Sequence, residues 1–143
     1  MEPEEKLSPA TAEKLRAIRG ALLHLHKTLL ERERDAYERG HGKIGNSYEY
    51  LNLVMHEPSF AWLRNLSELI VQIDETLDSR ETPSEITANA LIQQSRLLLT
   101  PNETGAEFQR KYFASVQESP EVVLAHAEFS RLLGPSRLSK DVH

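Results

Sequence analysis

The first helix that the sequence predicts begins in residues 8–30, which read SPATAEKLRAIRGALLHLHKTLL. Ser8 stands before Pro9, a pairing typical of a helix start: the hydroxyl can accept a hydrogen bond from a free backbone N–H, and proline fixes φ. Apolar residues then recur at steps of three and four, on one side of a helix, at Leu15, Ile18, Leu22, Leu25 and Leu29. The pattern predicts one helix from about Pro9 to Arg39, ended by Gly40.

The same start signal recurs along the chain. Hydroxyl–proline pairs stand at Thr82-Pro83, Thr100-Pro101 and Ser119-Pro120, and Asn46 with Glu49 is a further candidate start. Further helices are therefore predicted over about 47–55, 59–78, 83–99, 101–118 and 120–133. The 59–78 helix is the most apolar, so we expect it at the centre of the fold, with Trp62 in the core and Phe60 partly exposed.

Together these segments predict an all-α fold: an antiparallel helical bundle of five to six helices, with a long first helix and a central hydrophobic helix. Residues 1–135 are expected to form a single domain. Residues 136–143 are expected to be a disordered tail.

Composition excludes several classes of protein. The chain has 143 residues and no cysteine, which rules out disulfide scaffolds, zinc ribbons, iron–sulfur clusters and thiol chemistry. Its net charge of −5 argues against a nucleic-acid binder. We expect no signal peptide, because residues 1–6 are acidic and lack an apolar core, and no apolar run approaches the ~20 residues that span a membrane. We expect a soluble cytoplasmic protein that does not bind membranes.

The loop from Gly40 to Ser47 is the most suggestive motif. It resembles a phosphate-binding P-loop only superficially, because Asn46 stands where the lysine is needed and a helix, not a strand, precedes it. A weaker interpretation is a small-anion site built from His41, Lys43, Asn46 and Ser47 at a helix N-terminus. The alternative, which we favour, is an ordinary glycine-rich turn between helices.

Polar residues on or near the apolar stripes are a second candidate site. His26, Asp74 and His126 could converge on a small molecule, with Asp74 orienting His126 as a general base. The competing and favoured interpretation is a structural network of buried hydrogen bonds. A triad of Ser67, His126 and Asp74 can be assembled on paper, but the local sequence lacks a nucleophile elbow.

Metal and cofactor sites are not expected. The chain has no His-x-x-x-His, and its one Glu-x-x-His spans a helix end. We therefore predict no bound metal, no cofactor and no catalytic residues.

Three functions remain open, and they follow here from the most to the least favoured. The first is a non-enzymatic interaction or regulatory module that forms a homo-oligomer or binds a protein partner, because a first helix of about 45 Å exceeds the ~30 Å of a small domain. The second is a bundle that binds a small molecule or anion, at the Gly40–Ser47 loop or around His126 and Asp74. The third is a metal-dependent enzyme.

Overall fold

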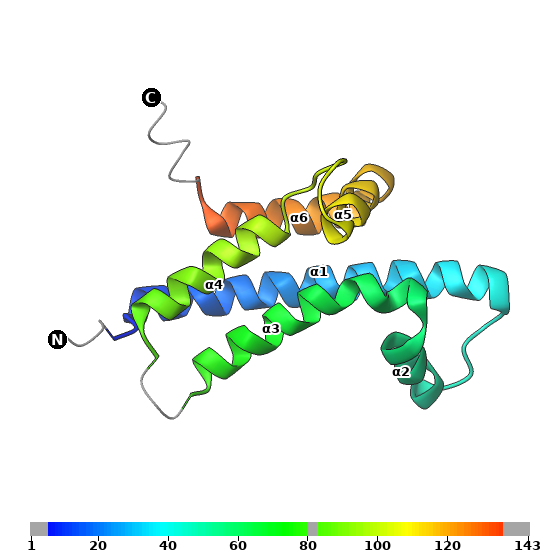
Figure 1. The fold of residues 1–143 in the computed structure, drawn as a ribbon, viewed down its shortest axis with the longest axis horizontal. Helices are drawn as coiled ribbons and strands as arrows, with labels where there is room; N and C mark the ends of the chain where they lie inside the picture. The colour runs from blue at the N-terminus through cyan, green and yellow to red at the C-terminus, as the bar shows by residue number, and fades with distance from the viewer. Residues whose placement is uncertain (1–5, 80–82, 136–143) are drawn as a thin grey trace.

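A computed structural model describes residues 6–79 and 83–135 of the chain, and within them it confirms the all-α bundle (Figure 1). Apart from one isolated bridge between Lys6 and Ser84, the regular elements of these residues are helices. In chain order they are α1 (Pro9–His41), α2 (Ser47–His56), the 3₁₀ helix η1 (Pro58–Leu63), α3 (Arg64–Leu77), α4 (Glu85–Leu98), α5 (Glu107–Glu118) and α6 (Pro120–Leu133). The tail predicted at 136–143 lies outside the described residues.

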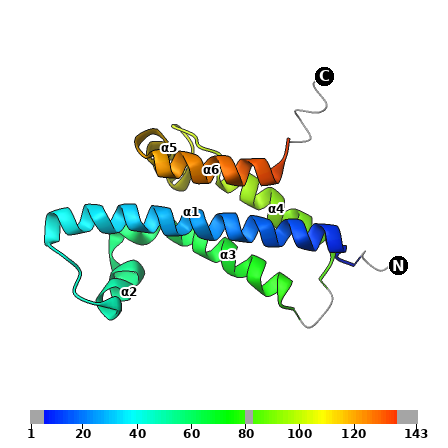
Figure 2. The same cartoon turned by 180° about the vertical axis from the view of Figure 1, so that it is seen from behind.

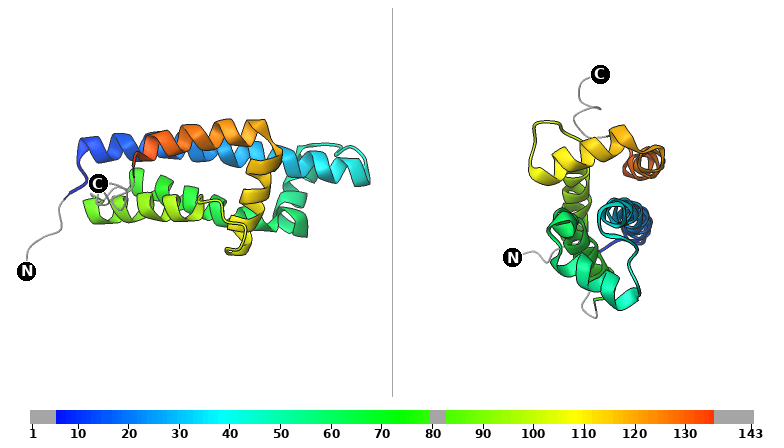
Figure 3. Two further views of the ribbon diagram at one scale, coloured as in Figure 1. Left: turned by 90° about the horizontal axis from the view of Figure 1, so that it is seen from above. Right: turned by 90° about the vertical axis from the view of Figure 1, so that its right-hand side faces the viewer.

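The long helix α1 lies in the middle of the bundle. It packs against α3, α4, α6 and η1. Figure 1 shows α6 above it and α3 below it, and Figure 2 shows the same arrangement from behind, with α1 in front. In the view from above, α6 lies alongside α1 and α5 runs across the bundle (Figure 3). The sequence predicts the 59–78 segment at the centre, whereas α1 holds that position because it packs against helices from both halves of the chain.

The predicted apolar stripe of α1 is buried. Leu15, Ile18, Leu22, Leu25 and Leu29 all belong to one hydrophobic cluster shared with α3, α4, α5 and α6. The 33 residues of α1 span about 50 Å at 1.5 Å per residue, and the end of the helix extends past α6 (Figure 3). That end is the charged third of the helix.

The predicted 59–78 helix begins as a 3₁₀ turn. Residues 58–63 form η1, and regular α-helix starts only at Arg64. Trp62 is buried, as predicted, and its indole N–H donates to the Glu33 carboxylate at 2.9 Å. The expectation that Phe60 is partly exposed is wrong: its ring is buried and makes an edge contact with the ring of Tyr50 on α2.

Helix α4 starts later than the sequence predicts. Its N-cap is Ser84, whose hydroxyl accepts from the Thr87 N–H at 3.0 Å, and Thr82 lies outside the described residues. The side chain of Glu85, in the first turn of α4, points to the start of α1. Its carboxylate accepts from the Ser8 N–H at 2.9 Å and from the Thr11 hydroxyl at 2.6 Å. Because of these bonds, the first turns of α1 and α4 are bound together.

Helix α5 also starts later, at Glu107 rather than near Pro101. The Thr100 hydroxyl donates back to the Arg96 carbonyl at 2.6 Å, so this residue ends α4 instead of starting α5. A hydroxyl–proline pair is compatible with a helix start, but here the preceding helix uses the hydroxyl.

The buried stripe of α1 predicts a large difference between neighbouring leucines. Leu22 is 0% exposed, whereas Leu23 is 49% exposed. We expect Leu22→Ala to lower the free energy of unfolding by about 2–5 kcal/mol, because it leaves a cavity among several helices. Leu23→Ala, the matched control, should cost less than about 1 kcal/mol. Urea unfolding followed by circular dichroism measures both, and equal losses would contradict the central position of α1.

Candidate functional site

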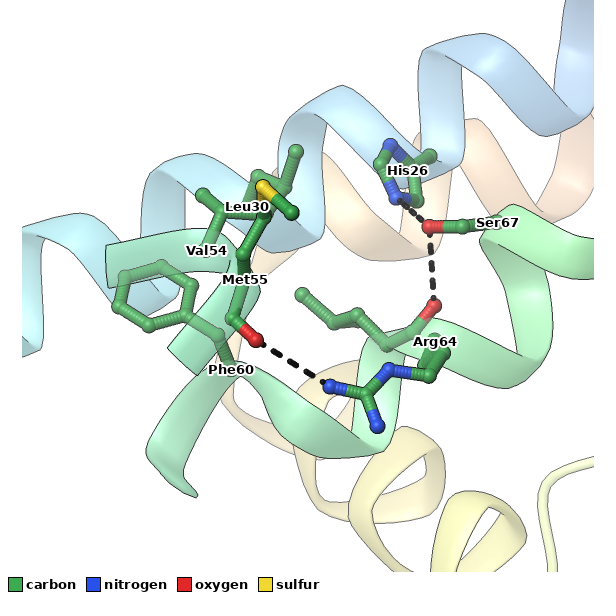
Figure 4. Close-up of a pocket in the computed structure, with 8 residues that line it drawn as sticks. His26, Leu30, Val54, Met55, Phe60, Arg64 and Ser67 are labelled. Atoms are coloured by element: carbon green, nitrogen blue, oxygen red, sulfur yellow. Dashed lines mark hydrogen bonds between the residues drawn. The ribbon is translucent and has the colours of Figure 1, made fainter. Parts of the chain in front are cut away.

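A cavity of about 370 Å³ lies where α1, α2, η1 and α3 meet (Figure 4). Most of its lining is apolar and comes from Leu30, Val54, Met55, Phe60 and Leu63. Its polar lining residues are His26, Arg64 and Ser67, and no Asp or Glu side chain lines it. Pockets of roughly 300–1,000 Å³ with apolar walls and a few polar groups are typical of small-ligand sites, so this cavity is the best-formed candidate.

One end of the cavity is a hydrogen-bonded pair. The Nε2 atom of His26 lies 2.7 Å from the Ser67 hydroxyl, which itself donates to the Leu63 carbonyl at 3.3 Å (Figure 4). Serine has one hydroxyl proton, so Ser67 can donate to the Leu63 carbonyl only while His26 carries its own proton on Nε2 and donates it to Ser67. Burial lowers the pKa of His26, so the neutral imidazole is favoured.

The His26–Ser67 pair does not reproduce a nucleophile and its base. In a catalytic serine–histidine pair a third group, usually a carboxylate, orients the imidazole. In the part of the chain that the structure describes, no carboxylate is hydrogen-bonded to His26. The pair is a structural bond between α1 and α3.

The opposite rim of the cavity is formed by Arg64. Its guanidinium donates to the Met55 carbonyl at 3.3 Å, in the last turn of α2 (Figure 4). A cation near a helix C-terminus is favourable, because free carbonyls give that end a partial negative charge. Arg64 therefore links the last turn of α2 to the start of α3.

Backbone N–H groups of the Gly40–Ser47 loop donate to carboxylates of the two flanking helices, α1 and α2. The N–H of Ile44 donates to Glu38 at 2.8 Å, and the N–H of Gly45 donates to Glu49 at 2.9 Å. Two backbone donors that an anion would need are therefore occupied by groups of the same charge. Gly42, with φ of 83°, ends α1 in a conformation that glycine adopts without strain.

The side chains predicted for this loop do not converge. His41 bonds to the Tyr37 carbonyl at 3.1 Å and stacks on the Tyr37 ring. The Asn46 side chain is the N-cap of α2, accepting from the Glu49 N–H at 2.8 Å. Lys43 and Ser47 are exposed. This geometry is that of a turn and a helix cap.

His126 and Asp74 are not hydrogen-bonded to one another. Asp74 instead pairs with Arg19 of α1 at 3.0 Å. The Nδ1 atom of His126 lies 2.7 Å from the hydroxyl of Tyr112, which stays protonated because burial raises the pKa of Tyr112. The Nε2 atom of His126 faces the Ser130 hydroxyl at 3.3 Å. Burial also lowers the pKa of His126.

A second cavity, of about 270 Å³, adjoins His126. Arg96 borders it, but its guanidinium donates to the carbonyls of Leu133 and Gly134 at 3.3 Å each. Two donors of this guanidinium are therefore occupied by the end of α6, whereas Arg64 donates to a single carbonyl. The cavity beside His26 is therefore the stronger candidate.

A further exposed feature lies on α2, which has no buried residue. Its outer face carries Tyr48, Leu51 and Met55, which are 81%, 57% and 55% exposed. Spacings of three and four place these side chains on one side of the helix. We call them the α2 stripe.

Comparison with protein-family models, with curated proteins and with solved structures gives no match. Across residues 6–79 and 83–135, no group of three or more His, Cys, Asp or Glu side chains could hold a metal ion. In the same residues, no helix is long and apolar enough to cross a membrane.

The sequence identified His26, but it grouped Ser67 with His126 and Asp74 and did not predict that Ser67 and Arg64 lie beside His26. Ser67 lies 41 residues further along, and Arg64 belongs to the polar side of a helix predicted mainly as core. Neither residue has a local signal, because their positions relative to His26 depend on how α3 packs against α1.

The lowered pKa of His26 predicts a pH-dependent stability. A group whose pKa is lower in the folded state favours folding above its unfolded pKa of about 6.5, and this contribution is lost as pH falls. We expect the melting temperature to fall from about pH 7.5 to about pH 5, and to fall less in His26→Gln. His56→Gln, at an exposed position, is the control. Equal pH profiles for wild type and His26→Gln would contradict this assignment.

Proposed function

We propose that this chain is a non-enzymatic interaction module that self-associates through the α2 stripe. The observation that supports the proposal is the exposure of three large side chains on one face of a helix that buries none of its residues. Single exposed apolar residues are common on protein surfaces, whereas a grouped set beside polar surroundings is typical of interaction sites.

The composition of α2 favours an interface. The helix contains one acidic residue, Glu49, and no lysine or arginine. Interface cores are depleted in charged residues and enriched in tyrosine and methionine, the types found in the stripe. An isolated helix of this length is marginal in water. Contact with η1 supports the inner side of α2, and a partner would cover its outer side.

A second copy is the partner that the stripe fits best. In an antiparallel pair related by a twofold axis at Leu51, Tyr48 of each copy would meet Met55 of the other. The end of α1 beside α2 carries both signs of charge, with Asp35 and Arg39 exposed. Such a surface can meet its own copy without net repulsion, despite the net charge of −5 of the chain.

The absence of cysteine agrees with a reducing compartment, so we propose a cytoplasmic location. A protein partner other than a second copy is the competing occupant, and the experiment below distinguishes the two.

Light scattering after size-exclusion chromatography, over a dilution series, tests self-association. We expect wild type to shift toward dimer as concentration rises, and Leu51→Glu to remain monomeric because it buries a charge at the centre of the stripe. Leu124→Glu is the matched control, since Leu124 on α6 is 71% exposed but lies outside the stripe.

A monomeric wild type at concentrations of about 0.5 mM would exclude any self-association tighter than that. The stripe would then belong to a different partner, or to none. Equal weakening by Leu51→Glu and Leu124→Glu would also contradict the proposal, because it would remove the specific role of α2.

A further inference from the structure

We propose that the cavity bordered by His26, Ser67 and Arg64 binds a small organic acid: one carboxylate on Arg64 and an apolar body between α1, α2 and η1. The proposal does not depend on self-association. It rests on the charge, the hydrogen bonds and the lining of the cavity.

The charge of the cavity differs from that of the whole chain. The net charge is −5, yet the lining contains no carboxylate, and Arg64 is its permanent charge. Among the described residues, Arg64 forms no ion pair, and its guanidinium makes one hydrogen bond, to the Met55 carbonyl. A guanidinium has five N–H donors and can bind a carboxylate through two of them. Arg64 can therefore accept an anion without releasing α2.

At the other polar end of the cavity, Ser67 already has hydrogen-bond partners. The hydroxyl of Ser67 already bonds to both His26 and the Leu63 carbonyl (Figure 4). A second polar group on the ligand would have to compete with these bonds. The ligand is therefore expected to have a single polar head.

The apolar walls of the cavity determine what kind of ligand body fits between them. Leu30, Val54, Phe60 and Leu63 present aliphatic and aromatic surface. The volume of about 370 Å³ lies near the lower end of small-ligand pockets, so it suits a single ring or a short alkyl chain. An aryl-alkyl or medium-chain monocarboxylate combines this body with the required head.

The probe that tests the proposal is 3-phenylpropionate, compared with its neutral amide and with acetate, in a two-dimensional ¹H–¹⁵N NMR titration. The acid is expected to shift the signals of residues around the cavity and to bind about tenfold more tightly than the amide, because charge-assisted hydrogen bonds are the stronger kind. Acetate, which has the head without the body, should not saturate below about 10 mM.

Arg64→Gln should lower the affinity for the acid to that of the amide. Arg110→Gln is the matched control: Arg110 is also exposed and also donates to a backbone carbonyl, that of Gly105 at 3.1 Å, but it lies on α5 away from the cavity. Val54→Phe narrows the cavity without changing its charge and should weaken acid and amide alike. Circular dichroism checks that each variant is folded.

Three results would overturn the proposal: equal binding of acid and amide, unchanged affinity in Arg64→Gln, or unchanged affinity in Val54→Phe. The last would place the acid on the surface near Arg64 instead of in the cavity. The titration is repeated in Leu51→Glu, so that a failure of self-association and a failure of ligand binding are separated.

Discussion

The burial of one face of α1 by several other elements is the constraint on which the structure depends. No other helix of the described residues is as long, and α3, α4, α6 and η1 all pack against it. Leu15, Leu22 and Leu29 succeed one another along this face, so each half of the chain obtains its core from the same stripe. The cavity is a consequence of the same packing, since His26 and Leu30 follow that stripe toward the end where fewer helices cover α1.

The sequence predicted the helices better than their boundaries, and the reason is physical. Spacing of apolar residues is a local property that persists in the fold, so α1 and α6 were predicted to within two residues. A helix cap depends on which of several possible hydrogen-bond partners the capping side chain contacts in the fold. Glu85 could cap its own helix, but its carboxylate binds Ser8 and Thr11 of α1. Thr100 could start α5, but its hydroxyl binds the carbonyl of Arg96. These hydrogen-bond partners cannot be read from a single sequence, because tertiary contacts determine them.

In the candidate site, too, the sequence identified some residues but not their hydrogen-bond partners. His26 and His126 stand out in the sequence because imidazoles on apolar stripes need a partner when buried. Their partners, Ser67 and Tyr112, could not be predicted: each bond joins two helices whose rotation relative to one another is set by packing. Asp74 was a reasonable candidate partner for His126, yet Arg19 on the neighbouring helix offers it an opposite charge. The structural interpretation of these histidines is the one the geometry favours.

Helix α2 connects the two proposals. Its outer side carries the stripe, whereas Val54 and Met55 line the cavity, and Arg64 holds its last turn. Met55 belongs to both surfaces, so a ligand in the cavity and a second copy on the stripe would contact the same helix. Any ligand that changes the position or the order of α2 must then change the affinity of self-association, and self-association must change the affinity for the ligand by the same factor.

The sign of this coupling depends on whether the ligand fixes α2 in the orientation that the stripe needs. Because Arg64 would bind both the Met55 carbonyl and a ligand carboxylate, a bound acid adds a contact at the end of α2 and favours order. We therefore expect positive coupling between the two equilibria.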